Sequence, residues 1–176
     1  MLLRALVLGL LSLFVLPPGQ AAARNCRIVG VTDGDTLTAR CGRPGAYRQI
    51  RVRIAAIDAP ERSQPYGQRA RQALSRLCYA EDAAIAERDT DRYGRMVADV
   101  SCRGQDAGRR MVADGWAWVY DYHGSASRRG GALFALQDEA RGRRAGLWAG
   151  TDPVPPWEWR RERRETHWGD RFLVPH

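Results

Sequence analysis

The sequence predicts an α+β fold, a five-stranded OB-fold β-barrel with three helices. Two observations carry this expectation. The first third of the chain alternates apolar and polar residues in short runs separated by turn residues, as in a meander of strands. Farther along, helical spacing and strand spacing follow one another, which gives the order three strands, one helix, two strands and two helices.

The first three strands come in quick succession. Residues 26–41 are expected to form a strand, a turn at Asp33-Gly34-Asp35 and a second strand. Ile50 to Ile54 then alternates, with its apolar side chains on one face and two arginines on the other. Short turns between these runs favour an antiparallel arrangement.

Apolar residues at helical spacing recur in three places. They predict helices over residues 66–78, 105–114 and 131–144. Between the first and second of these helices, residues 83–86 and 95–100 are expected to form the fourth and fifth strands.

The chain divides into three parts. Arg4, the apolar run from Leu6 to Leu16 and the small-residue sequence Ala21-Ala22-Ala23 predict a cleaved secretory signal over residues 1–23, with an uncleaved membrane anchor as the alternative. Residues 24–150 would form the barrel domain, and residues 151–176 a Pro/Trp/Arg-rich C-terminal tail. We therefore expect a secreted or periplasmic monomer without stable membrane association once the signal is removed.

Charge points to a polyanionic partner. The chain has 176 residues and a formal charge of +8, and all of its 28 basic residues are arginine. The excess lies in residues 24–150, where 22 arginines face 15 acids, whereas the tail has five of each. A basic surface suits nucleic acid. The charge run over 160–165 is typical of a solvated helix face, so the tail is not expected to clamp nucleic acid. Phosphate-binding loops of the GxxxxGK[ST] or GxGxxG type are absent from the sequence.

Four cysteines in an exported chain predict disulfides. Cys26 and Cys41 each lie seven positions from the Asp33-Gly34 turn and could therefore face each other across a hairpin. Of the three possible connectivities we favour Cys26–Cys41 with Cys78–Cys102. Four buried free thiols are the alternative.

Three short blocks combine carboxylates or guanidinium groups with turn residues. They span residues 31–36, 53–61 and 91–95, and each alone could be an ordinary turn or helix start. Together they supply a complete set for attack on a phosphodiester. Asp35 and Asp58 offer hard oxygens suited to Ca²⁺, and Glu61 could deprotonate a water. Two arginine forks, Arg53 and Arg95, suit a phosphate.

In this order the blocks resemble the staphylococcal nuclease (thermonuclease) family. The resemblance covers residues 26–148 and includes Gly115-Trp116-Ala117 and Gly146-Leu147-Trp148. It implies an OB-fold barrel with three helices and a Ca²⁺-dependent nuclease that acts on DNA, RNA or both and leaves a 3′-phosphate.

The resemblance also implies roles for individual residues. Asp35, Asp58 and the carbonyl of Ala59 would hold Ca²⁺, with Asp33 as an acidic residue behind them. Arg53 and Arg95 would bind the scissile phosphate, Glu61 would be the base, and Arg92 and Tyr93 would touch a terminal phosphate.

Other functions stay open at this point. A barrel that binds nucleic acid without cutting it is the main alternative, and a calcium-stabilised structural domain is another. The family stacks nucleotides on tyrosines after its second helix. Here Tyr120 and Tyr122 are displaced by one position, so their role is open.

Overall fold

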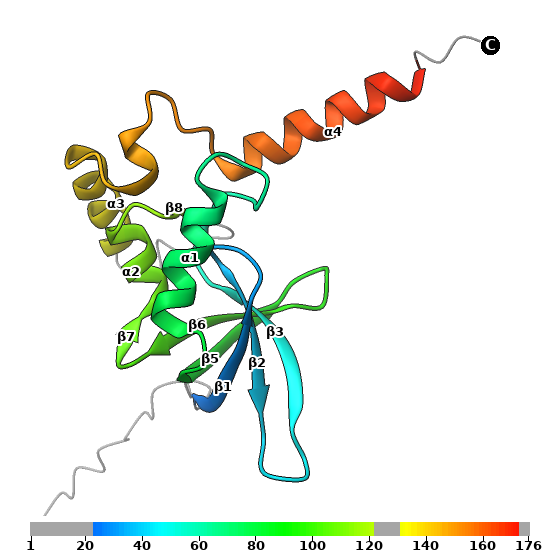
Figure 1. The fold of residues 1–176 in the computed structure, drawn as a ribbon, viewed down its shortest axis with the longest axis vertical. Coiled ribbons are helices and arrows are strands. Elements are labelled where there is room, and N and C mark those ends of the chain that lie inside the picture. The colour runs from blue at the N-terminus through cyan, green and yellow to red at the C-terminus, as the bar shows by residue number, and fades with distance from the viewer. Residues whose placement is uncertain (1–22, 122–130, 173–176) are drawn as a thin grey trace, which may run out of the picture.

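Five strands close into the barrel that the sequence predicts. In the computed structural model, which describes residues 23–121 and 131–172, the strands lie in the order β3-β2-β1-β5-β6. Parallel pairing of β3 with β6 closes the barrel, and Figure 1 shows it from the side. The strands are β1 (Arg24–Val31), β2 (Thr36–Cys41), β3 (Arg48–Ile54), β5 (Asp82–Thr90) and β6 (Met96–Cys102).

Both favoured disulfides are present. Cys26 lies opposite Cys41 in the β1–β2 hairpin, and their Cα atoms are 4.4 Å apart. Cys78 ends the first helix and is joined to Cys102 at the end of β6. The second bond therefore ties a helix to the barrel wall.

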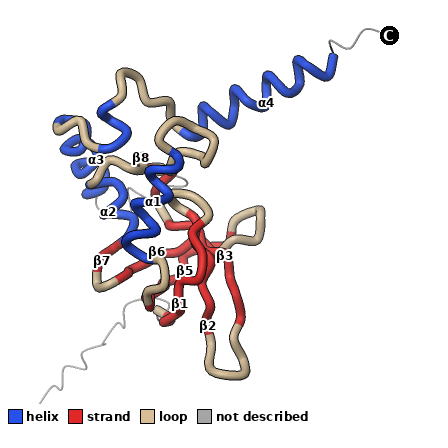
Figure 2. The backbone as a smooth tube through the Cα atoms, viewed as in Figure 1, coloured by secondary structure: helices blue, strands red, loops and turns tan. Residues whose placement is uncertain are grey.

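Three predicted helices are confirmed, with ends that differ by a few residues. They are α1 (Gly67–Cys78), α2 (Ala107–Ala113) and α3 (Ala132–Gly142). Figure 2 shows them gathered along one side and one end of the barrel. The face of α1 that carries Ala70 and Leu74 is buried in the common core. Asp106 caps the start of α2, because its carboxylate accepts the N–H of Arg109.

Several elements were not predicted. Two-residue strands β4 (Ile57–Asp58), β7 (Gln105–Asp106) and β8 (Trp118–Val119) are too short to show a period, and a 3₁₀ turn, η3 (Gly146–Ala149), follows α3. A fourth helix, α4 (Pro156–Phe172), corrects the expected number of three.

The C-terminal helix starts beside the barrel and projects away from it, as Figure 1 shows. Within the described ranges, no helix is long and apolar enough to cross a membrane. The predicted signal lies outside the described residues apart from Ala23.

Candidate active site

The turn between β1 and β2 places two aspartates at one end of the barrel. Thr32 N–H donates to the Thr36 carbonyl at 2.9 Å and closes the turn. Asp33 Oδ1 accepts the N–H of Asp35 at 3.1 Å, and Thr36 Oγ1 donates to Asp35 Oδ1 at 2.8 Å. Asp35 is only 3 % exposed. Its carboxylate is therefore fixed before any ligand arrives.

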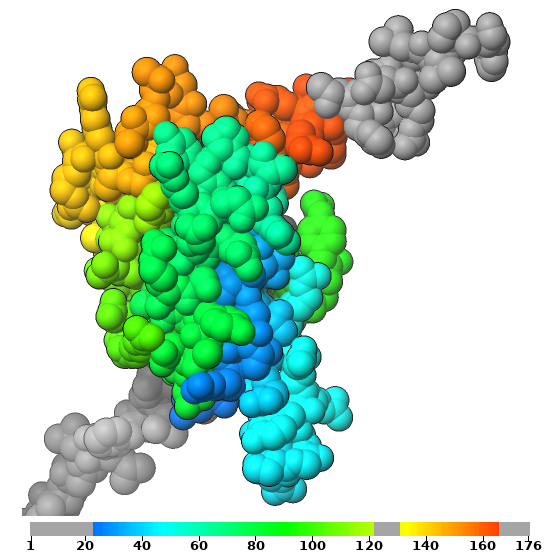
Figure 3. Space-filling view, viewed as in Figure 1, coloured from blue at the N-terminus to red at the C-terminus, as the bar shows by residue number. Residues whose placement is uncertain are grey.

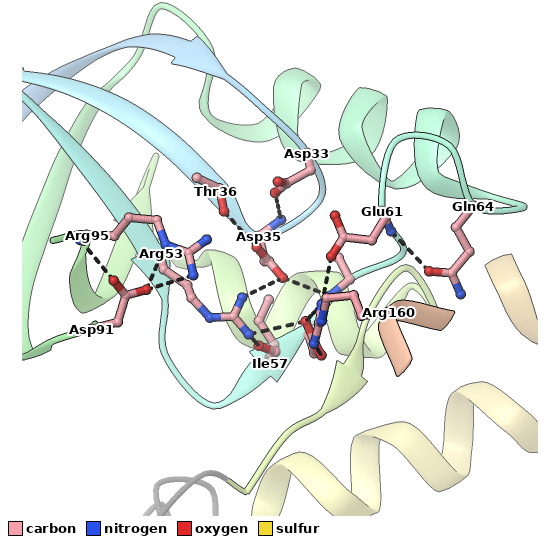
Figure 4. A network of polar contacts seen from close by, with 12 residues as sticks. Asp33, Asp35, Thr36, Arg53, Ile57, Glu61, Gln64, Asp91, Arg95 and Arg160 are labelled. Atoms are coloured by element: carbon pink, nitrogen blue, oxygen red, sulfur yellow. Dashed lines mark hydrogen bonds and ion pairs between the residues drawn. The ribbon is translucent and has the colours of Figure 1, made fainter. Parts of the chain in front are cut away.

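Arg53 joins the two predicted metal ligands. It lies near the end of β3, opposite Thr36 of β2. Its Nη1 donates to Asp35 Oδ2 at 3.1 Å, and its Nη2 donates to Asp58 Oδ1 at 3.2 Å and to the Ile57 carbonyl at 3.1 Å. Figure 4 shows this guanidinium at the centre of the network. The structure therefore brings together the first two blocks found in the sequence.

Burial and neighbouring charges together set the pKa values of these groups. Burial raises the pKa of Asp35, but Arg53 and the N–H of Ala59 outweigh it and hold that pKa below its ordinary value. Burial also raises the pKa of Asp58, and there Arg160 and Arg53 offset only part of the rise. Burial and the nearby Asp35 charge raise the pKa of Asp33 to about 7. Burial alone would lower the pKa of Arg53, but Asp35 and Asp58 raise it, so its charge is permanent.

Two carboxylates and one backbone segment make up the candidate metal ligands. Ala59 N–H donates to Asp35 Oδ2 at 2.9 Å, so the residue after Asp58 lies directly against Asp35. Among the described residues, no group of three or more His, Cys, Asp or Glu side chains is arranged to hold a metal ion. A cation here would therefore rely on Asp35, Asp58 and backbone or water oxygens.

Glu61 lies in the loop between β4 and α1, and its partner was not predicted. Arg160, in the first turns of α4, donates from Nη1 to Glu61 Oε1 at 2.7 Å and from Nη2 to Asp58 Oδ2 at 2.6 Å. The sequence interpretation of a solvated charge run holds for residues 161–165, which are exposed, but is wrong for Arg160. Sequence spacing could not reveal this contact, which spans about one hundred residues of chain.

The third block forms a turn beside the cluster. Asp91 Oδ1 accepts the N–H groups of Tyr93 and Arg95 at 2.9 and 3.0 Å, and its Oδ2 binds Arg95 Nε at 2.7 Å. Arg95 precedes Met96, which pairs with Val52 next to Arg53. Figure 4 shows Arg95 and Asp91 on the Arg53 side of the network. The second predicted phosphate fork is thus close to the first but is held by its own carboxylate.

The two residues expected at a terminal phosphate lie on the surface of this turn. The guanidinium carbon of Arg92 is 4.9 Å from the centre of the Tyr93 ring, and that of Arg95 is 5.5 Å from it. An open cavity of about 310 Å³ beside the turn is lined in part by Arg51, Tyr93 and Arg95.

Of the two tyrosines after α2, the structure describes only the first. Tyr120 packs against Trp157 of α4, with ring centres 5.6 Å apart. Tyr122 lies outside the described residues. In this structure the tail therefore packs against Tyr120.

Comparison with known proteins supports one family. A model described as "Staphylococcal nuclease homologue" matches residues 51–150. Protein ParB of Escherichia coli is 39 % identical over 159 residues, which cover 85 % of this chain and 86 % of that protein. A micrococcal nuclease of Shigella flexneri is 37 % identical, with 85 % of this chain and 87 % of that protein covered. An uncharacterized endonuclease of Haemophilus influenzae is 36 % identical, with 92 % and 87 % covered. With this domain match, these near full-length relatives and the expected barrel, the chain belongs to the staphylococcal nuclease family.

Proposed function

We propose that this chain is a Ca²⁺-dependent nuclease that hydrolyses phosphodiester bonds of DNA, RNA or both. The observation that carries the proposal is the position of Arg53, 3.1 Å from Asp35 and 3.2 Å from Asp58. One guanidinium between two buried carboxylates puts a phosphate-binding group and a cation-binding pair in the same place. Membership of a nuclease family and relatives named as nucleases support the same reaction.

Ca²⁺ suits the available ligands. Asp35 and Asp58 offer hard carboxylate oxygens, and the carbonyl of Ala59 would add a third ligand. Burying carboxylates is costly without a compensating cation, and burial raises the pKa of Asp58 although two arginines contact it. When bound, Ca²⁺ would supply positive charge that offsets the charge developing on the phosphoryl oxygens.

The protein's own side chains account for the remaining steps. Arg53 uses three N–H groups on Asp35, Ile57 and Asp58, so two of the five that a guanidinium carries remain for a phosphate oxygen. Arg95 would bind the same phosphate from the turn that precedes β6. Glu61 would take a proton from the attacking water while the water oxygen bonds to phosphorus. The bond from phosphorus to the leaving oxygen breaks, and that oxygen takes a proton from solvent.

A non-catalytic binding module explains less of the site. Such a module would use the basic barrel, but it would give no role to Glu61 or to the buried pair Asp35 and Asp58. We also propose that the protein is monomeric and secreted or periplasmic. Two disulfides are compatible with an oxidising compartment.

The proposal is tested with purified residues 24–176. The protein is incubated with supercoiled plasmid, single-stranded DNA and RNA, each with Ca²⁺ and with EGTA. We expect cleavage with Ca²⁺, its loss in EGTA and its loss in Asp35→Ala. Binding without cleavage in Ca²⁺ would instead support the non-catalytic module.

A further inference from the structure

The C-terminal segment touches the loop that carries Glu61 at several points. Gln64 of this loop is 5 % exposed. Its Oε1 accepts the N–H of Glu61 at 3.1 Å, and its Nε2 donates to the Val154 carbonyl at 2.6 Å. Arg163 Nη1 lies 3.3 Å from Ser63 Oγ. Figure 3 shows the orange C-terminal segment lying against the teal loop before α1. These contacts therefore hold the tail against the loop that carries Glu61, the proposed base.

Two further sets of contacts hold the first turn of α4 in place. Pro156 begins the helix, and the Pro155 carbonyl accepts the N–H groups of Glu158 and Trp159 at 3.0 Å. Trp157 packs against Tyr120. Residues three apart lie on the same face of a helix, so this packing directs Arg160 toward the barrel end where the carboxylates lie.

Arg160 links two acids that would otherwise repel each other. Its Nη2 binds Asp58 Oδ2 at 2.6 Å, while its Nη1 binds Glu61 Oε1 at 2.7 Å and lies 3.3 Å from Asp58 Oδ1. Asp58 is fully buried, whereas the Glu61 side chain is 37 % exposed and extends from a loop. A planar guanidinium can hold both acids in one fixed geometry, which a single point charge cannot do.

We propose that Arg160 is a positioning residue of the nuclease site, which holds the Glu61 carboxylate beside Asp58 in the orientation that accepts the proton of the attacking water. This inference rests on the proposed function. It makes the C-terminal segment part of the active site rather than an appendage. The positive charge of Arg160 lies beside Asp58, a proposed Ca²⁺ ligand. Removing Arg160 is therefore not expected to weaken Ca²⁺ binding.

Kinetics and metal binding together separate this role from a structural one. Arg160→Ala should lower kcat by about 10- to 100-fold, since misplacing a reacting group or removing its outer partner has that effect. KM for DNA should stay within about threefold, because Arg160 faces carboxylates and not substrate. Arg160→Lys should have an intermediate kcat. Arg161→Ala, an exposed neighbour on the same helix, is the matched control and should match the wild type.

Two readouts do not depend on turnover. Calorimetric titration should show that Arg160→Ala binds Ca²⁺ at least as tightly as the wild type. Hydrogen exchange should become faster at the amides of Gln64 and Gly67, which donate within the Glu61 loop to the carbonyls of Glu61 and Gln64.

The outcomes also distinguish this inference from the proposed function. If Glu61→Gln and Asp35→Ala lose activity but Arg160→Ala keeps the wild-type kcat, only the positioning role is wrong. An increase in kcat would also overturn it, since Arg160 would then obstruct the site. Wild-type activity of Glu61→Gln and Asp35→Ala would overturn the proposed function itself. If melting curves show that Arg160→Ala does not fold, the kcat of Arg160→Lys decides, and a wild-type value would reject the inference.

Discussion

Adding one methyl group at Gly34 tests how tightly the site is built. A Cβ at this position would lie 2.6 Å from the Cβ of Ala59 and 2.8 Å from the Cβ of Ala70. Carbon atoms pack at about 3.5–4.0 Å. In Gly34→Ala the turn that carries Asp35 must therefore move about 1 Å away from Ala59 or from α1.

The expected effects follow from this displacement. Overpacking in a close-packed region costs about 1–3 kcal/mol of stability. A shift of about 1 Å in a catalytic group can cost about 10²-fold in rate. Urea denaturation measures the first effect, and initial rates of DNA hydrolysis by fully folded protein measure the second. Calcium titration should show weaker binding, because Asp35 and Ala59 no longer keep their spacing.

Gly142→Ala is the control. This glycine lies at the end of α3, and a Cβ there meets no atom within 4 Å. The substitution should leave the rate unchanged and stabilise the protein by at most about 1 kcal/mol. If Gly34→Ala matches the wild type in stability, Ca²⁺ affinity and rate, the close contact between the turn and Ala59 is wrong.

Three further predictions follow from the same geometry. Burial raises the pKa of Asp33 to about 7. Between about pH 4 and pH 7 the folded protein therefore keeps this carboxyl protonated while the unfolded chain ionises it, so the fold loses stability as the pH rises. In metal-free buffer Asp33→Asn should therefore be more stable than the wild type at pH 7.5, by up to about 4 kcal/mol. This difference in stability should vanish near pH 4. Thermal melts that show the same difference at both pH values would contradict the prediction. Replacing Cys26 and Cys41 by alanine opens a 15-residue loop. In urea denaturation this should lower the free energy of unfolding by about 3 kcal/mol, and no loss of stability would show that the bond does not constrain the unfolded chain. Arg95→Lys keeps its charge beside Asp91 but loses the planar fork, so the folded variant should hydrolyse DNA about 10²-fold more slowly than the wild type. A wild-type rate would show that Arg95 serves only as a structural partner of Asp91.

The sequence predicted the barrel because its strands and helices follow clear periods. Alternation over Ile50 to Ile54 and the turn at Asp33-Gly34 predicted the first three strands, and the seven-residue spacings around that turn gave the Cys26–Cys41 pair. Elements such as β4 and β8 have two residues each and depend on pairing with each other. No local pattern could reveal them.

The sequence named the candidate site residues but could not name the distant residues that contact them. Blocks near in sequence, such as Arg53 to Glu61, identified the carboxylates and the first guanidinium. The sequence did not identify Arg160, because its contacts depend on where α4 packs and not on the residues beside it in the chain. Three further arginines of the same charge run, at positions 161, 163 and 164, are exposed. Arg160, three residues after Trp157, instead contacts Asp58 and Glu61.

The most direct test of the account is the turnover number of folded Arg53→Lys with Ca²⁺ and saturating DNA. Lysine keeps the positive charge but cannot span Asp35 and Asp58, which the Arg53 guanidinium contacts at 3.1 and 3.2 Å. If these three residues form one catalytic unit, turnover should fall by about 10²-fold or more while the protein stays folded. Turnover within about threefold of the wild type would contradict the assignment of this cluster as the active site.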